Sequence, residues 1–239
     1  MKLRDSVALV TGAGRGIGRA IALTLAKEGA NVVLTSRTLS ELQEAKKEIE
    51  SFGGRASIVQ ADLTQDVQVG KLFEEVRTRH ARLDILVNNA GIGIFAPFRD
   101  LTVAELDQMW NVNMRAVVVS TQHAMKFMEL QRSGAIVNVA SLAGRNAFVG
   151  GAGYAATKWA LIGFSRSLVL EVREQNIPVI TICPRSVDTS FSKTPKEPSR
   201  SEKILHPQDV ADTILAALML PDRAMVSEIL KLRASKPQL

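Results

Sequence analysis

Short runs of apolar residues alternate along the chain with longer segments in which apolar residues recur every three or four positions. A continuous apolar run of five to seven residues is typical of a strand that is buried on both faces of a sheet. Such runs predict strands at about 6–11, 31–37, 56–62, 83–91, 135–141, 178–184 and 225–230. The periodic segments between them predict helices at about 18–28, 40–52, 69–76, 102–130, 154–175 and 207–220.

Two of these helices carry further local signals. Ser40 and Gln43 predict a capping box at the start of the second helix, which two glycines then end. The apolar stripe of that helix is Leu42, Ala45, Ile49 and Phe52. The long helix at 102–130 is expected to break near 111–113, where two asparagines interrupt the pattern.

The regular alternation of strands and helices predicts the fold class. We expect one α/β domain over residues 1–239, with a Rossmann-type, doubly wound parallel sheet of about seven strands and helices on both faces. A ligand should bind at the carboxyl ends of the strands. Residues 189–207 are rich in Ser, Lys and Pro and lack a period, so we expect a mobile loop or short lid that shapes the substrate pocket.

Composition fits this globular fold. Hydrophobic residues make up 46% of the chain and charged residues 23%, which argues against a disordered protein. Cys183 is the single cysteine and cannot form an intramolecular disulfide, so a reducing compartment is expected. No apolar run approaches the length of a membrane span and no signal peptide is recognised, which favours a cytoplasmic protein.

The net charge of +6 would suit a phosphate-rich ligand or an acidic partner. Nucleic acid is not expected, because the basic residues are scattered and no recognition-helix or zinc-finger spacing occurs. His80, His123 and His206 are too far apart to form a local metal motif, so we predict no metal site.

A glycine-rich turn follows the first predicted strand. Gly12, Gly16 and Gly18 are spaced G-x-x-x-G-x-G at the junction between strand and helix. Glycines there permit positive φ, let the backbone approach a pyrophosphate and let the helix pack closely on the strand. The backbone N–H groups and the helix dipole would then face the anion.

Tyr154 and Lys158 are four residues apart on a predicted helix and therefore share one face. A positive charge close to a phenol favours the phenolate and lowers the pKa of the tyrosine, which makes it useful for proton transfer. Tyr154 is the only tyrosine of the chain, and Ser141 ends the apolar run before this helix.

Taken together, these motifs resemble those of the short-chain dehydrogenase/reductase superfamily over essentially the whole chain. Within it the chain is similar to bacterial 3-oxoacyl-[acyl-carrier-protein] reductases and related carbonyl reductases. The motifs that carry the resemblance are T-G-A-G-R-G-I-G at 11–18, N-N-A-G at 88–91, Asn113, Ser141, and Tyr154 with Lys158.

The resemblance implies a role for each residue of the catalytic set. Tyr154 would be the general acid or base, and Lys158 would lower its pKa and bind the nicotinamide ribose. Ser141 would hold the substrate oxygen, and Asn113 would fix a water in a proton path. The implied cofactor-binding residues are Gly12, Arg15, Gly16, Ile17, Gly18, Ser36, Arg37, Asp62, Leu63, Asn89, Ala90, Gly91, Tyr154, Lys158, Pro184, Val187 and Thr189.

The end of the second strand predicts which nicotinamide cofactor is used. An acidic residue there commonly selects NAD, whereas an arginine accommodates the 2′-phosphate of NADP. This chain has Ser36 followed by Arg37, and Arg15 in the glycine turn could reach the same corner. No carboxylate is expected to oppose the phosphate, so we predict NADP(H).

The chain departs from the family pattern at two places. Arg185 replaces the glycine of the family's P-G-x-V-x-T segment, which puts the local backbone in doubt, because only glycine takes some φ/ψ values. The C-terminal segment lacks the V-D-G-G of many fatty-acid-synthesis reductases, which argues against the acyl-carrier substrate and the associated tetramer contact.

The sequence favours an NADP(H)-dependent oxidoreductase acting on a ketone or secondary alcohol. One alternative is a 3-oxoacyl thioester reductase whose basic surface meets an acidic carrier, and the candidate residues are Lys126, Arg132, Arg166 and Arg173. Another is a cofactor-binding sensor or scaffold without turnover. We also expect a homodimer or homotetramer built from the helices at 102–130 and 154–175, because Trp159, Phe164 and the run 116–119 give them excess apolar surface.

Overall fold

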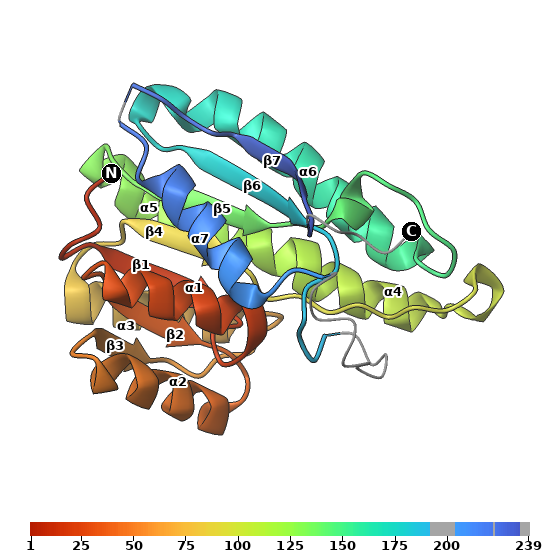
Figure 1. Ribbon diagram of the computed structural model, residues 1–239, viewed down its shortest axis with the longest axis horizontal. Helices are drawn as coiled ribbons and strands as arrows, with labels where there is room; N and C mark the ends of the chain where they lie inside the picture. Colours follow the sequence, from red (N-terminus) through yellow and green to blue (C-terminus); the bar gives the residue numbers. More distant parts are fainter. Residues whose placement is uncertain (192–203, 222, 235–239) are drawn as a thin grey trace.

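The computed structural model of the chain describes residues 1–191, 204–221 and 223–234. Seven strands form one sheet in the order β3-β2-β1-β4-β5-β6-β7, and every neighbouring pair is parallel (Figure 1). The strands are β1 (Val7–Thr11), β2 (Asn31–Thr35), β3 (Arg55–Ile58), β4 (Ile85–Asn88), β5 (Ala135–Val139), β6 (Val179–Pro184) and β7 (Glu228–Leu232). The predicted doubly wound parallel sheet is confirmed.

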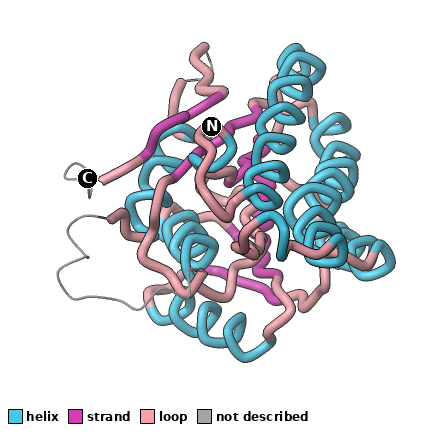
Figure 2. The backbone as a smooth tube through the Cα atoms, turned by 90° about the vertical axis from the view of Figure 1, so that its right-hand side faces the viewer, coloured by secondary structure: helices cyan, strands magenta, loops and turns pink. Residues whose placement is uncertain are grey.

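Helices cover both faces of this sheet, as the two views in Figures 1 and 2 show. Apolar side chains of α1, α2 and α7 pack on one face, and those of α3, α5 and α6 pack on the other. Both faces of each central strand are therefore buried, which explains their continuous apolar runs. The helices are α1 (Gly16–Lys27), α2 (Leu39–Ser51), α3 (Asp66–His80), α4 (Val103–Trp110), α5 (Ala116–Gln131), α6 (Ala152–Val172) and α7 (Pro207–Leu218).

The order of the strands reverses between β1 and β4, which lie side by side. In open parallel sheets a ligand binds at the carboxyl ends of the strands next to such a point. Here the Thr11 hydroxyl donates to the carbonyl of Val87 (3.1 Å) and accepts from the backbone N–H groups of Asn89 (2.9 Å) and Ala90 (3.0 Å). A single threonine thus fixes the two chain segments that leave this edge.

Buried amides brace the middle of the sheet. Asn88 and Asn138 are paired in register on β4 and β5, and the Asn88 amide donates to the Asn138 side chain (2.9 Å). Asn138 in turn donates to the hydroxyl of Ser165 on α6 (2.8 Å), and Asn88 also donates to Thr121 on α5 (3.2 Å). Because a buried amide without partners is costly, this network fixes how α5 and α6 sit on the strands.

The predicted interruption of the long helix is confirmed. Helices α4 and α5 are joined by one turn of π-helix, Asn111–Arg115, whose centre holds the fully buried Asn113. Turns of this kind often mark functional sites within helices.

Several predicted boundaries are wrong. Helix α2 begins at Leu39 and its N-terminus has no side-chain cap, so Ser40 does not form the expected capping box. Instead, the chain turns just before the helix, where the Ser36 hydroxyl accepts a hydrogen bond from the N–H of Thr38 (3.3 Å). Phe52, expected on the buried stripe, lies beyond the helix and is exposed.

Several strands also have other bounds than predicted. Strand β3 ends at Ile58 rather than near 62, and β7 begins at Glu228 rather than at 225. Strand β4, inside the sheet, covers Ile85–Asn88 rather than 83–91, because the N–H groups of Asn89 and Ala90 donate to the Thr11 hydroxyl instead of to the backbone of a neighbouring strand. The predicted loop at 189–207 is described only at its ends, where Val187 forms an isolated parallel bridge with Leu205. Its remaining part, 192–203, lies outside the described residues.

Candidate active site

The glycine turn joins β1 to α1 at the carboxyl edge of the sheet. Gly12 and Gly16 have φ values of +64° and +55°, a region that side chains disfavour. A Cβ on Gly18 would lie 2.2 Å from the carbonyl oxygen of Gly12, so only glycine allows the helix to begin this close to the strand. The turn therefore has the shape that a dinucleotide pyrophosphate requires.

The corner beside this turn is more acidic than the sequence predicts. Ser36 and Arg37 follow β2 and line the same cavity as Arg15. However, Glu41 on α2 also reaches the corner, where its carboxylate lies 3.5 Å from the Arg15 guanidinium. The expectation that no carboxylate is present is wrong, because Glu41 comes from the next helix rather than from the strand end.

Residues that come after β3 and β4 line the opposite side of this part of the cavity. The Asp62 carboxylate accepts from the N–H (3.0 Å) and hydroxyl (2.8 Å) of Thr64, which orients the turn before α3. The Asn89 amide donates to the carbonyls of Thr11 (2.9 Å) and Gly12 (3.3 Å). Asn89 thus holds the glycine turn from the other side of the strand reversal.

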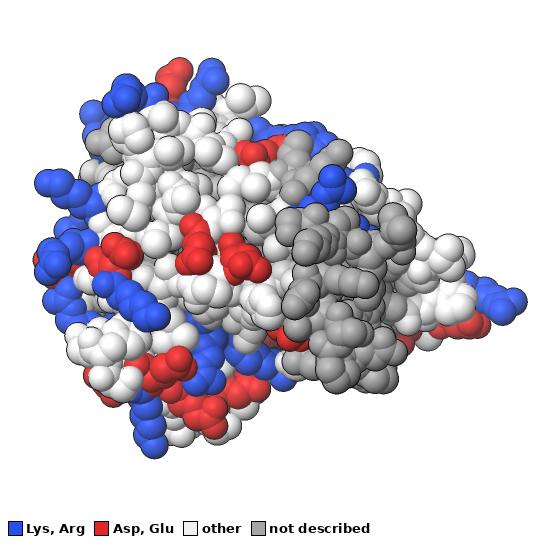
Figure 3. Space-filling model, in the orientation of Figure 1, with Lys and Arg blue, Asp and Glu red and all other residues white. Residues whose placement is uncertain are grey.

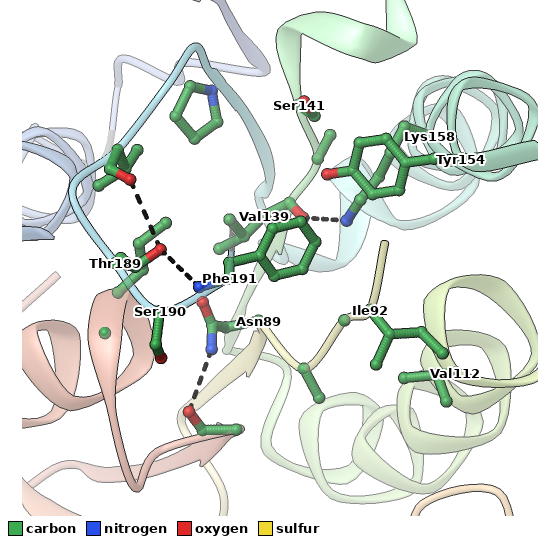
Figure 4. A pocket seen from close by; sticks show the side chains of 18 of the residues that line it. Asn89, Ile92, Val112, Val139, Ser141, Tyr154, Lys158, Thr189, Ser190 and Phe191 are labelled. Carbon is green, nitrogen blue, oxygen red and sulfur yellow. Dashed lines mark hydrogen bonds between the residues drawn. The ribbon is translucent and has the colours of Figure 1, made fainter. Parts of the chain in front are cut away.

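The catalytic set expected from the sequence comes together at the start of α6 (Figure 4). Tyr154 and Lys158 project from one face of the helix, with the Lys158 nitrogen 5.9 Å from the centre of the tyrosine ring. The ammonium donates to the carbonyl of Val139 at the end of β5 (2.9 Å). Ser141 lies two residues further along, and its hydroxyl accepts from the N–H of Ala143 (3.1 Å).

Burial controls the ionisation of both groups. Tyr154 is 8% exposed and Lys158 is 4% exposed. Burial raises the pKa of Tyr154 to about 12, while hydrogen bonding with the Ser141 side chain works against this rise. Burial lowers the pKa of Lys158 to about 8. In the protein alone, the expected lowering of the Tyr154 pKa by Lys158 is therefore not found, because loss of water penalises the charged form of each group.

Asn113 lies behind the catalytic set. Its side-chain oxygen accepts from the N–H of Ile92 (2.8 Å), and its amide donates to the Ile92 carbonyl (2.8 Å) and to the Thr157 hydroxyl (3.0 Å). A Cβ on Gly91 would lie 3.3 Å from the Asn113 oxygen and 3.7 Å from the Lys158 nitrogen. Asn113 and Lys158 therefore adjoin the same glycine, and the π-turn places the asparagine there.

The segment after β6 closes the other side of the site. Arg185 is not among the described residues with positive φ, so its substitution for the family glycine does not distort the backbone. Its N–H donates to the carbonyl of Leu232 (2.8 Å), which continues the pairing of β6 with β7. A Cβ on Gly16 would lie 3.2 Å from a methyl group of Thr189, so this segment reaches the glycine turn.

These groups line one cavity of about 1130 Å³. Drug-sized ligands occupy pockets of roughly 300–1,000 Å³, so there is room for a dinucleotide together with a small substrate. All predicted site residues line the cavity except Gly18 and Asn113, which lie directly behind it. A nicotinamide dinucleotide fits this arrangement, because Gly12, Gly14 and Gly16 line the cavity at the turn that would hold its pyrophosphate and carry no Cβ.

The sequence missed other residues that line the cavity. Among them are Glu41, Arg233 and the aromatic residues Phe95, Phe148 and Phe191. Each phenylalanine belongs to a loop that follows the carboxyl end of a strand, namely β4, β5 or β6. Their position after strand ends is the sequence signal for them, because ligands of parallel sheets bind at the carboxyl ends of the strands.

Some charged groups outside the cavity have structural partners. On the face that Figure 3 shows, Lys and Arg side chains are interspersed with Asp and Glu. Arg166, a candidate for meeting an acidic carrier, is paired with Glu228, which also binds Arg145. His123 stacks on Phe73 with ring centres 5.0 Å apart, and burial lowers the pKa of His123.

The described part of the chain contains neither a candidate membrane span nor a candidate metal cluster. None of its helices has the length and apolar character needed to cross a membrane. Within the same residues, no group of three or more His, Cys, Asp or Glu side chains could hold a metal ion.

Comparison with known proteins identifies the family. The short chain dehydrogenase family matches residues 6–199, and the chain belongs to this family. An uncharacterized oxidoreductase of Staphylococcus aureus (strain MRSA252) is 35% identical over 227 residues, which cover 95% of this chain and 96% of the relative.

Solved structures show the same fold over the full length. A metagenomic short-chain oxidoreductase in complex with NADP is 34% identical, with a TM-score of 0.86 and complete coverage of both chains. A 7α-hydroxysteroid dehydrogenase complexed with NADH and 7-oxo glycochenodeoxycholic acid is 29% identical, with a TM-score of 0.90 and coverage of 100% of this chain and 97% of the other. The protein is thus an enzyme of the short-chain dehydrogenase type. Because these two relatives hold different cofactors, the residues of this chain must decide between NADP and NAD.

Proposed function

We propose that this protein is an NADP(H)-dependent oxidoreductase that interconverts ketones and secondary alcohols. The observation that carries the proposal is the position of Tyr154 and Ser141, which share one cavity with the glycine turn. A proton donor and a hydrogen-bonding hydroxyl thereby meet at the place where a nicotinamide would end. The complex of a related short-chain oxidoreductase with NADP supports the cofactor.

The residues of this chain would handle the proton and the developing negative charge. When bound, NADPH supplies a hydride to the carbonyl carbon and leaves as NADP⁺. Tyr154 gives its proton to the carbonyl oxygen, which completes the alcohol. The Ser141 hydroxyl donates to the same oxygen as charge develops on it. Lys158 then stabilises the tyrosinate, with Asn113 fixing a water through which the proton is replaced.

The predicted choice of NADP(H) rests on Ser36 and Arg37. A guanidinium can bind a phosphate through two hydrogen bonds, and no acidic residue occupies the strand end itself. Glu41 weakens this preference, because its carboxylate would repel a phosphate in the same corner. Arg15 offsets that effect, since it already pairs with Glu41 at 3.5 Å. We therefore expect NADPH to be favoured while NADH remains usable.

One experiment tests the reaction directly. The oxidation of NADPH is followed by absorbance in the presence of a panel of methyl ketones, and the alcohol product is identified by chromatography. We expect turnover with at least part of the panel and one alcohol formed for each NADPH consumed. A protein that binds NADPH tightly but turns over neither ketones nor alcohols would instead support the sensor or scaffold alternative.

A 3-oxoacyl thioester remains the second candidate substrate. One observation favours it, namely that Arg185 and Arg233 both line the cavity although no ion pair is found for either among the described residues. Two such cations would suit the phosphates of a coenzyme A or carrier-linked thioester. A 3-oxoacyl coenzyme A should then be reduced much faster than a short neutral thioester of the same acyl chain, and Arg185→Ala with Arg233→Ala should remove the difference. Equal rates for the two thioesters would exclude this role.

We also propose that the enzyme works in a reducing, cytoplasmic compartment. The support is its single thiol, Cys183, which is buried and free. Oxidising compartments favour disulfides, and this chain cannot form one within itself.

A further inference from the structure

Three phenylalanines form a group of aromatic rings beside Tyr154. Phe95 contacts Tyr154 edge to face with ring centres 5.4 Å apart, and Phe191 contacts it from another side at 5.9 Å. Phe148 extends the group by packing on Phe95 at 5.9 Å. We call Phe95, Phe148 and Phe191 the aromatic cluster. Figure 4 shows the Phe191 ring beside Tyr154 on the cavity side.

The loops that carry the cluster are held in place by their backbones. The N–H of Ala96 donates to the carbonyl of Gly150 (3.1 Å), which ties the loop of Phe95 to that of Phe148. Glycines make room for the rings: a Cβ on Gly93 would lie 2.7 Å from the Phe95 ring and 3.0 Å from the Phe191 ring. A Cβ on Gly151 would lie 2.2 Å from the Phe148 ring. The positions of the rings are therefore built into the loops.

The cluster is too exposed to be part of the hydrophobic core. Phe95, Phe148 and Phe191 are 47%, 46% and 42% exposed, and all three line the cavity. An apolar surface gathered in a cavity indicates a ligand that covers it. Among the described lining residues, none that the segments 90–98 and 142–151 contribute is charged. This end of the cavity can therefore bind an uncharged apolar group, and it offers aromatic faces and edges to it.

We propose that the substrate carries an aromatic ring next to its carbonyl or alcohol group, and that Phe95 and Phe148 hold this ring while Tyr154 and Ser141 meet the oxygen. This inference rests on the proposed function and specifies its substrate class. Aromatic pairs prefer edge-to-face or offset contacts and bind more strongly than their buried area alone predicts. A saturated ring of similar size would fill the same space without this gain.

The test compares methyl phenyl ketone with methyl cyclohexyl ketone in the presence of NADPH. The ratio of the two kcat/KM values is measured in the natural protein, in Phe95→Leu and in Phe148→Leu. Comparing the phenyl-to-cyclohexyl ratio of a variant with that of the natural protein cancels the intrinsic difference in reactivity between the two ketones. Each substitution should lower the phenyl-to-cyclohexyl ratio about two- to tenfold, the range expected for one aromatic contact. The value for the cyclohexyl ketone serves as the internal control for general damage to the site.

Phe98→Leu is the matched control variant. Phe98 lies in the same segment as Phe95, is 79% exposed and does not line the cavity. Its substitution should leave the ratio unchanged. An unchanged ratio in both Phe95→Leu and Phe148→Leu would overturn the proposal even if the enzyme reduces both ketones, in which case the proposed function survives.

A binding measurement covers the case in which neither ketone is turned over. Calorimetry with NADP⁺ present gives the dissociation constants of the same two ketones for the natural protein and both leucine variants. Tighter binding of the phenyl compound that is lost in the variants would support the aromatic site although the proposed function had failed. Equal affinity for the two ketones in the natural protein would overturn the inference.

Discussion

The Lys158 nitrogen donates to the Val139 carbonyl at 2.9 Å and lies 5.9 Å from the centre of the Tyr154 ring. The lysine is buried at the carboxyl ends of the strands. No carboxylate forms an ion pair with it in the described part of the chain, and burial lowers the pKa of Lys158 to about 8. An unpaired buried ammonium is costly and is retained where its charge has a use. In the proposed function, that use is to stabilise the tyrosinate that forms during the reaction.

Lys158 should make the folding stability depend on pH. The pKa of Lys158 in the folded protein is about 8, below its ordinary value of 10.5, so the unfolded chain binds more protons between these two values. The free energy of unfolding therefore rises with pH in this window, by roughly 2–3 kcal/mol between pH 7 and pH 10. Lys158→Met should lack this contribution. Denaturant unfolding of both proteins at the two pH values measures it, and equal pH dependence would contradict the assigned pKa.

Tyr154 should titrate well above its ordinary range in the protein without cofactor. Because it is the only tyrosine, the ultraviolet absorbance of tyrosinate reports on this residue alone. Burial raises the pKa of Tyr154 to about 12, so the folded protein should show little tyrosinate at pH values where the unfolded chain is mostly ionised. Addition of NADP⁺ should shift the titration to lower pH, because the oxidised ring brings positive charge. A native protein that titrates near pH 10 would refute the effect of burial.

Tyr154→Phe should abolish turnover and leave cofactor binding nearly intact. The substitution removes only the oxygen that transfers the proton, a contribution typically worth about 10² to 10⁴ in rate. The phenylalanine keeps the ring that packs against Phe95. Single-turnover rates and NADPH titrations, measured on the same preparation, separate the two effects. Near-native turnover would exclude Tyr154 as the general acid.

Arg37→Ala should weaken NADPH much more than NADH. A hydrogen bond to a charged group contributes roughly 1.5–3 kcal/mol, so the loss for NADPH should be about ten- to a hundredfold. Ser36→Asp should lower the use of NADPH further and improve that of NADH. Glu41→Gln should have the opposite effect, tightening NADPH by removal of a nearby negative charge. Fluorescence titrations with both cofactors measure these changes, and an equal loss for NADPH and NADH in Arg37→Ala would show that the phosphate binds elsewhere.

The protein should form a homo-oligomer through α4, α5 and α6. Trp110, Trp159 and Leu170 on these helices are 44%, 52% and 62% exposed, which is unusual for large apolar side chains. Part of the run 116–119 belongs to the core instead, since Ala116 and Val117 are buried. Light scattering should give at least a dimer at micromolar concentration, and Trp159→Glu should dissociate it. A monomeric mass for the natural protein would rule out this interface.

Local sequence patterns predicted the secondary-structure elements and the parts of the site that lie close together along the chain. Periodicity is a property of neighbouring residues, so it predicted the seven strands, the helices and the break at Asn113. The glycine turn and the pair Tyr154 and Lys158 are likewise set by short spacings along one strand-helix junction and one helix face. The expected capping box at Ser40 failed, because a hydrogen bond between Ser36 and Thr38 started the helix earlier.

Which distant residues share the cavity, and how they ionise, depends on the packing of the folded chain. Glu41 meets Arg15 because α2 packs beside the glycine turn, and the aromatic cluster forms because three separate loops end at one sheet edge. Burial raises the pKa of Tyr154, which is opposite to the direction that a nearby lysine alone predicts, and it lowers the pKa of Lys158. Contacts between distant segments and the loss of solvent around a side chain arise only when the chain packs. Local sequence patterns therefore do not predict them.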